Sequence, residues 1–239
     1  MADIAGKLEI VADADALAAR AADIIAERMA AASSTFRLVL AGGSTPRHAY
    51  ELLAQRKLDW DRAEIFFGDE RFVPPDDPRS NYRMAREALL DHISPCKLFP
   101  IPTDGTPQSA ADRYEEILRQ QYGSSGLERD VPLFHVTLLG LGDDGHTASL
   151  LPDQPVLQER GRWVAVVPQG RDTQRITLTY PALESSALIL FLVAGASKRD
   201  ALAQARGGAL PAGALKPRGA VIWLADAAAA GQDDEGYGF

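Results

Sequence analysis

Residues 36–46 read FRLVLAGGSTP, and this stretch decides the fold. The first five residues are mostly apolar and predict a β-strand. The glycines Gly42 and Gly43 permit a sharp turn, after which Ser44 or Thr45 can cap a helix whose first residue is Pro46. We therefore predict a strand at 36–40 that leads through a tight turn into a helix over 46–56.

The same alternation of strand and helix continues outward from this stretch. The helical spacing of Leu17, Ile24, Ile25 and Met29 predicts a helix over 13–32. Further strands are predicted at 63–67, 133–139, 163–167, 175–179, 187–193 and 220–224, and further helices at 82–92, 110–122 and 197–206. Because several strands are apolar on both faces, the pattern indicates an α/β fold: a Rossmann-like, mostly parallel sheet with helices on both faces.

We place all these strands in one sheet and expect residues 1–226 to form a single α/β catalytic domain. The Gly/Ser stretch at 123–126 is then a loop rather than a boundary. The segment 227–239 is small, acidic and contains glycine, so we expect a flexible C-terminal tail.

Composition limits the possible partners. The chain has 239 residues and a formal net charge of -8, which argues against nucleic acid or an anionic membrane as the main partner. No apolar run reaches the roughly 18 residues of a membrane helix, and the acidic N-terminus does not resemble a secretory signal. The single cysteine, Cys96, excludes an internal disulfide framework. We expect a cytoplasmic protein that acts on a small molecule.

The turn at 42–45 has the features of a phosphate site. Gly42 and Gly43 allow close approach of a ligand, and backbone N–H groups at a helix start, with Ser44 and Thr45, favour an anion. The spacing is not that of a Walker A loop. A plain strand–turn–helix junction remains the alternative.

Residues 140–145, GLGDDG, follow an apolar strand and match the dinucleotide motif G-x-G-x-x-G. Asp143 and Asp144 would face a pyrophosphate, and the next strand does not end in the acidic residue that holds a ribose, so we disfavour this interpretation. Instead, we predict that the loop presents His146 as a general base oriented by Asp144. The alternative is a purely structural loop in which His146 caps a helix.

Three cationic residues also follow or begin strands. Arg71 belongs to Asp69-Glu70-Arg71 after strand 63–67, Lys198 follows strand 187–193, and Arg175 begins its strand. An arginine offers a forked donor for phosphate or carboxylate. The alternatives are a loop clasp for Arg71 and solvated surface charges for the other two.

Other catalytic classes lack their motifs. The chain contains neither G-x-S-x-G nor H-E-x-x-H, and its four histidines are dispersed. Neither a covalent serine nor a metal site is therefore predicted, although Asp143 and Asp144 could hold a cation. Water activated by His146 is the simplest mechanism.

Taken together, the motifs resemble those of the 6-phosphogluconolactonases. The matching segments are LAGGSTP (40–46), GDERFV (68–73), SNY (80–82), LGLGDDGHTASL (139–150), RITLT (175–179) and VAGASK (193–198). The resemblance implies a fold shared with glucosamine-6-phosphate deaminases and ribose-5-phosphate isomerases. It also implies hydrolysis of 6-phospho-D-glucono-1,5-lactone to 6-phosphogluconate without metal or organic cofactor.

The resemblance assigns roles to residues as well. It implies that His146 is the base, and we expect Asp144 to orient it and Arg71 to assist at the oxyanion. The predicted substrate- and phosphate-binding residues are Gly42, Gly43, Ser44, Thr45, Asp69, Arg175 and Lys198.

Two alternatives to the lactonase remain. In the deaminases the histidine is followed five residues later by a glutamate, where this chain has Leu151, and a tyrosine stands where this chain has Arg71. Both departures favour the lactonase. A non-catalytic sugar-phosphate sensor on the same fold is the second alternative.

Overall fold

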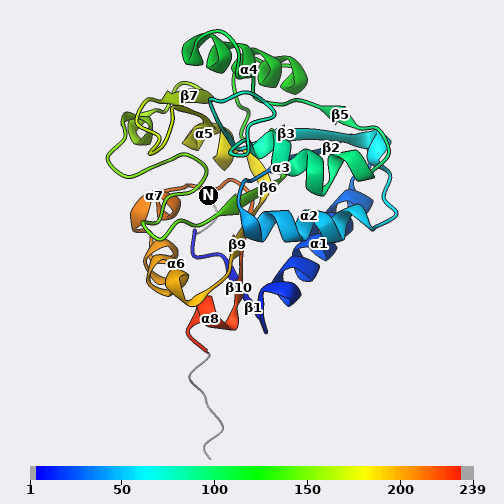
Figure 1. Ribbon diagram of the computed structural model, residues 1–239, viewed down its shortest axis with the longest axis vertical. Coiled ribbons are helices and arrows are strands. Elements are labelled where there is room, and N and C mark those ends of the chain that lie inside the picture. Colours follow the sequence, from blue (N-terminus) through cyan, green and yellow to red (C-terminus); the bar gives the residue numbers. More distant parts are fainter. Residues whose placement is uncertain (1–3, 233–239) are drawn as a thin grey trace, which may run out of the picture.

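The structure is a computed structural model that describes residues 4–232 (Figure 1). Its strands are β1 (Lys7–Val11), β2 (Phe36–Leu40), β3 (Ala63–Phe67), β4 (Asp69–Arg71), β5 (Lys97–Leu98), β6 (Phe134–Gly140), β7 (Val164–Val167), β8 (Arg175–Leu178), β9 (Ser186–Val193) and β10 (Ala220–Asp226). Its α-helices are α1 (Ala14–Ala31), α2 (Ser44–Ala54), α3 (Asn81–Ala88), α4 (Pro107–Tyr122), α5 (Tyr180–Glu184), α6 (Arg199–Arg206), α7 (Leu210–Gly213) and α8 (Ala227–Ala230). Short 3₁₀ turns lie at Trp60–Arg62, Leu90–His92, Pro155–Gln158 and Ala196–Lys198.

The central sheet has seven strands in the order β1-β10-β9-β6-β2-β3-β5, and every pairing in it is parallel. All its strands therefore end at the same edge. The chain runs from β2 outward to β3 on one side, and from β6 outward to β9 on the other. The carboxyl ends of β2 and β6 thus form the topological switch point, where ligands bind in open α/β sheets.

Helices cover both faces of this sheet, as predicted. Helices α1, α2 and α3 pack side by side on one face. The connections that carry α4, α5 and α6 run across the sheet in the opposite direction, and right-handed crossovers place these helices on the other face. Between the layers lies a core that includes Phe191 and Trp223, which stack with ring centroids 3.7 Å apart.

A second, antiparallel sheet has the order β4-β8-β7. This corrects our expectation that segments 163–167 and 175–179 belong to the main sheet. The reason is β4: the chain turns at Gly68 after leaving β3, and the next three residues pair with β8, so that Arg71 lies opposite Arg175. The second sheet therefore joins the end of β3 to the edge of the switch point.

The predicted elements otherwise recur with small shifts. Helix α2 begins at Ser44 rather than Pro46, and the helix predicted over 82–92 is divided into α3 and a 3₁₀ turn. The tail expected from residue 227 begins as α8, whose first turn is capped by Asp226 and buries Ala229. Residues 233–239 lie outside the described part of the chain. No helix within residues 4–232 combines the length and apolarity needed to cross a membrane.

Candidate active site

A cavity of about 230 Å³ opens at the switch point between β2 and β6. The residues that line it are Ala41, Gly42, Gly43, Asp69, Arg71, Asn81, Gly140, Leu141, Gly142, His146, Thr147, Ala148, Arg175 and Lys198. The cavity thus brings together seven of the predicted site residues from the ends of five strands, β2, β4, β6, β8 and β9. Asp144, Ser44 and Thr45 are the predicted site residues that do not line it.

The glycine turn after β2 forms one wall. Gly43 is the N-cap of α2 with φ of +113°, a conformation that favours glycine, and no side chain caps the helix. Our expectation that Ser44 or Thr45 would cap is therefore wrong; both lie in the first turn, where a helix leaves its N–H groups without intrahelical partners. At Gly42, a Cβ atom would lie 2.0 Å from Asn81 Oδ1, so glycine is required there.

His146 is held against its own loop. Its Nδ1 lies 2.5 Å from Asp144 Oδ1, and its carbonyl accepts a hydrogen bond from the Gly142 N–H at 2.8 Å. A Cβ atom on Gly142 would lie 2.0 Å from Nδ1, so the imidazole occupies the space that a larger residue would fill. A proton on Nδ1 donated to Asp144 leaves Nε2 free to accept one. The pair has the geometry of an oriented general base.

The Asp144 carboxylate is shared with an arginine that the sequence did not indicate. Arg171 Nη2 lies 2.5 Å from Asp144 Oδ2. Burial acts to raise the pKa of Asp144, but hydrogen bonds from His146 and Arg171 outweigh it and lower the pKa to about 2. Asp144 therefore carries its negative charge throughout the physiological range.

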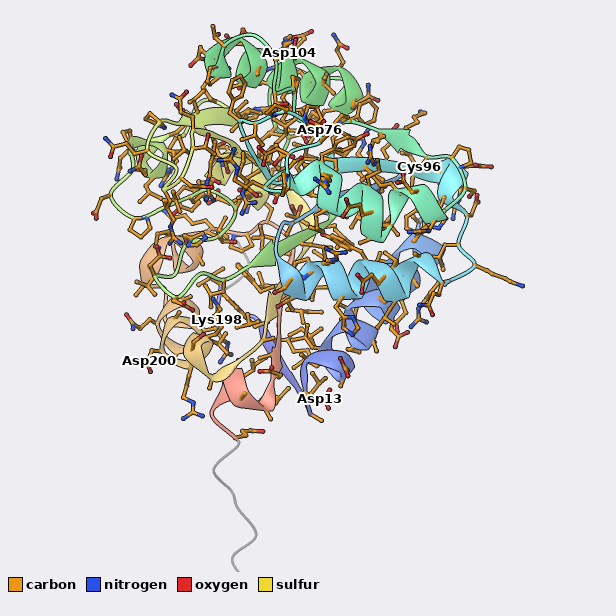
Figure 2. All side chains as sticks on the ribbon, viewed as in Figure 1. Asp13, Asp76, Cys96, Asp104, Lys198 and Asp200 are labelled. Carbon is orange, nitrogen blue, oxygen red and sulfur yellow. The ribbon has the colours of Figure 1, made fainter. Side chains whose placement is uncertain are left out.

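The adjacent carboxylate points to a different partner. Asp143 Oδ1 accepts hydrogen bonds from Lys198 Nζ at 2.7 Å and from Ser197 Oγ at 3.2 Å. Lys198 lies beside the start of α6 (Figure 2). The two neighbouring aspartates thus bind separate partners, Asp143 with Lys198 and Asp144 with His146 and Arg171.

Arg71 and Arg175 lie directly opposite each other in β4 and β8. Arg71 Nη1 donates to the Arg79 carbonyl at 2.6 Å, and Arg175 Nη2 donates to Asp172 Oδ1 at 3.1 Å. The Nε atoms of both arginines are buried without a hydrogen-bond partner within residues 4–232. Two adjacent guanidinium groups with donors to spare favour an anionic ligand in the cavity.

The two acidic residues of the Asp69-Glu70-Arg71 segment form hydrogen bonds with other groups of the protein. Asp69 Oδ2 accepts from Ser149 Oγ at 2.5 Å, and the Asn81 amide contacts the Asp69 backbone and side chain. Glu70 is 2% exposed and accepts from the N–H groups of Arg71, Asn81 and Tyr82 and from Ser80 Oγ. This geometry favours a scaffolding role for both acids. Asp69 lines the cavity, but its predicted contact with substrate stays a prediction.

Sequence reasoning missed Asn81 and Arg171 as members of this site. Asn81 lies within the SNY segment of the family resemblance, which was the available signal. Arg171 lies in the loop between β7 and β8, outside every recognised motif, and only the fold brings it to Asp144.

The chain is similar to known proteins over a range that includes every residue lining the cavity. A family model described as glucosamine-6-phosphate isomerases/6-phosphogluconolactonase matches residues 12–223. The chain is 42% identical over 233 residues to a 6-phosphogluconolactonase of Nostoc sp., covering 93% of this chain and 96% of that one. The solved 6-phosphogluconolactonase from Trypanosoma cruzi is similar, with a TM-score of 0.84 and 28% identity over 96% of this chain and 97% of that one. A monomeric glucosamine-6-phosphate deaminase shares the fold, with a TM-score of 0.79 and 23% identity over 95% of this chain and 99% of that one.

Proposed function

The chain belongs to the glucosamine-6-phosphate isomerase/6-phosphogluconolactonase family, and we propose that it hydrolyses 6-phospho-D-glucono-1,5-lactone to 6-phosphogluconate in the oxidative pentose phosphate pathway. The observation that carries this proposal is the pairing of His146 with Asp144 at a cavity that Arg71, Arg175 and Lys198 also line. On this proposal the protein is a hydrolase that acts on the ester bond of a lactone, and we expect it to work in the cytoplasm.

The anionic end of the substrate fits the cationic side of the cavity. We assign the phosphate to the start of α2, with Arg175 and Lys198 as its charged partners. Binding there requires Lys198 to exchange its ion pair with Asp143 for one with the phosphate. Fixing the phosphate holds the lactone carbonyl near His146 and removes much of the entropic cost of orienting it.

The chemical step uses water and one imidazole. His146 Nε2 takes a proton from water as the water oxygen bonds to the lactone carbonyl carbon. Asp144 stabilises the resulting imidazolium, and Arg71 donates to the developing oxyanion. The bond from the carbonyl carbon to the ring oxygen then breaks, and His146 returns its proton to that oxygen. The carboxylic acid product loses its own proton to solvent.

Replacement of His146 tests the assignment of the base. His146→Ala is expected to lower kcat for lactone hydrolysis by roughly 10²–10⁴-fold, the usual range for a general base. The assay follows acid release, and His48→Ala, which alters a histidine on α2 paired with Asp15 and Glu51, is the matched control. An unchanged kcat in folded His146→Ala would reject His146 as the base.

The deaminase remains the alternative activity because the two enzymes share a fold. The position of the deaminase glutamate is occupied here by Leu151, a buried apolar residue. This departure supports the lactonase. Ammonia release from glucosamine 6-phosphate would favour the deaminase instead, and binding of sugar phosphate without turnover of either substrate would indicate a sensor.

A further inference from the structure

Arg171 contacts both members of the proposed base pair. Its Nη2 lies 2.5 Å from Asp144 Oδ2 and 3.3 Å from His146 Nδ1, while Asp144 Oδ1 lies 2.5 Å from the same Nδ1. A guanidinium only donates, so the longer contact is not a hydrogen bond when Nδ1 carries a proton; the carboxylate, which is closer and only accepts, favours the proton on Nδ1. The two carboxylate oxygens of Asp144 are therefore divided between an imidazole and a guanidinium. Neither the sequence motifs nor the family resemblance assigns any role to Arg171.

The backbone at Arg171 adopts a strained conformation. Its φ is +74°, in the left-handed region that a non-glycine residue rarely occupies. Strain of this kind persists only where surrounding contacts enforce it, and it concentrates at functional sites. The neighbouring Asp172 pairs with Arg175, the first residue of β8, at 3.1 Å, which is a local contact between residues three apart. The loop between β7 and β8 is thus held at two points: Arg171 pairs with Asp144 on the loop after β6, and Asp172 pairs with the start of β8.

The solvent exposure of Arg171 and Asp144 limits how much their ion pair contributes to stability. The side chains of Arg171 and Asp144 are 55% and 37% exposed. A pair this exposed contributes little to stability, because water screens it. It can still fix the direction of the carboxylate, which would otherwise rotate and accept hydrogen bonds from water. The Asp144 orientation in turn determines which nitrogen of His146 carries the proton.

We propose that Arg171 is a positioning residue that locks the Asp144 carboxylate, so that His146 holds its proton on Nδ1 and presents Nε2 to the substrate. The proposal rests on the proposed function, since it needs His146 to be the base. Arg171 acts through Asp144 and does not itself touch the lactone. It adds a third member to the predicted Asp144–His146 pair.

Kinetics of Arg171 variants test this role. Arg171→Ala is expected to lower kcat about tenfold, within the range by which supporting residues affect their ligands, and to leave KM within about twofold. Arg171→Lys keeps a cation that can reach Asp144 and should recover part of the loss. Arg113→Ala is the matched control: Arg113 is 47% exposed, pairs with Asp104 at 2.8 Å, and should leave kcat unchanged. Asp104 lies at the far end of the molecule from Lys198 (Figure 2).

A double-mutant cycle shows whether Arg171 acts through Asp144. In an Asp144→Ala background, Arg171→Ala should have no further effect on kcat, because the carboxylate that it positions is gone. Equal losses in both backgrounds would overturn the proposal. So would a KM increase without a change in kcat, which would make Arg171 a substrate-binding residue.

The tautomer of His146 gives a readout that a merely structural role would not move. Two-bond ¹H–¹⁵N spectra at alkaline pH distinguish the two neutral tautomers, and the chain has only four histidines to assign. The wild-type His146 signal should report Nδ1–H, and Arg171→Ala should mix the two forms. An unchanged Nδ1–H signal in that variant would reject the proposal. If His146→Ala keeps full activity, the proposed base fails; if it is inactive while Arg171→Ala equals wild type, only the role of Arg171 fails.

Discussion

At the scale of the residue, Gly142 shows why a dinucleotide-like motif occurs in a chain for which we propose a different chemistry. In GLGDDG this glycine makes room for an imidazole, because a Cβ atom would lie 2.0 Å from His146 Nδ1 and 2.7 Å from Asp144 Oδ1. Glycine is needed at this position so that the loop can pack against its own side chains, not so that it can bind a nucleotide. A motif defined by glycines therefore indicates that another group lies close to the backbone. That group can be a side chain of the same protein rather than a bound nucleotide.

Replacing Gly142 should displace the proposed base. We expect Gly142→Ala to lower kcat by roughly 10²-fold, since a shift of about 1 Å in a reacting group can cost that much. Steady-state lactone hydrolysis by the folded variant measures the effect. Gly126→Ala is the control, because a Cβ there meets nothing within 4 Å. Wild-type kcat in Gly142→Ala would mean that the ring position seen here is not the active one.

Ionisation of Asp144 should make the stability of the fold depend on pH. Its pKa is lowered to about 2 from an ordinary value of 3.8, so its ionised form is favoured in the folded protein. A carboxyl of this kind stabilises the fold above its unfolded-state pKa, and the contribution is lost as pH falls through its folded-state pKa. The loss should therefore fall between about pH 4 and pH 2.

Thermal unfolding of wild type and Asp144→Asn tests this window. The wild type should have the higher Tm at neutral pH, and the gap between the two proteins should close as pH falls from about 4 to 2. The gap should be small, because Asp144 is more than one-third exposed. A gap that stays constant over this interval would show that the carboxylate is not stabilised in the folded state.

At the scale of the element, side chains secure the strand ends from which the site is built. The Tyr50 hydroxyl of α2 accepts from the Ala41 N–H and donates to the Ala41 carbonyl, directly after β2. Tyr114 of α4 does the same for Phe67 at the end of β3. Asp226 accepts from the Gly195 N–H, which precedes Lys198. The turns that face the cavity are therefore fixed by helices and strands behind them.

Removing one of these hydroxyls should affect both stability and binding. Tyr50→Phe leaves the buried N–H of Ala41 without its partner, which costs about 1–3 kcal/mol. Because Gly42 follows directly, KM for the lactone should also rise. Denaturant unfolding and steady-state kinetics measure the two effects. Tyr122→Phe should change neither, because the hydrogen bonds that it removes, to the Val131 carbonyl and from the Glu128 N–H, are exposed to water.

The elements also show how far sequence reasoning reaches. Most of the longer strands and helices were predicted from their apolar residues, and their alternation was sufficient to predict the parallel sheet and its helical layers. The edge strands β1 and β5 of that sheet were missed. The separate sheet that holds β7 and β8 was not predictable, because β4, the strand that pairs with β8 on its other side, has three residues and reads as a polar loop. Arg171 was missed for the same reason: long-range pairing, not local sequence, brings it to Asp144.

At the scale of the whole molecule, the two sheets meet at the site. The main sheet supplies His146 and Lys198 from its strand ends, and the second sheet supplies Arg71 and Arg175. A chain with a net charge of -8 thus gathers three cations around one cavity. This charge distribution attracts an anionic small molecule to the cavity while the surface as a whole stays acidic.

Because Arg71 and Arg175 face each other, binding of an anion between them should stabilise the fold. Like charges directly opposite each other in an antiparallel pair repel, and Arg71 and Arg175 have buried Nε atoms without partners. A phosphorylated ligand would neutralise the pair and bridge the two sheets. Ligand affinity and global stability should therefore be coupled through these residues.

That coupling can be measured with the product, which is not consumed. At 100 times its Kd, 6-phosphogluconate should stabilise the fold by about 2.7 kcal/mol and raise Tm. Unphosphorylated gluconate at the same concentration should have a much smaller effect, because the cations would lack their main partner. Arg175→Ala and Lys198→Ala should each reduce the shift, whereas Arg113→Ala on α4 should not. Equal shifts with gluconate and 6-phosphogluconate would show that these cations do not recognise the phosphate, and that the acidic group of the ligand binds elsewhere.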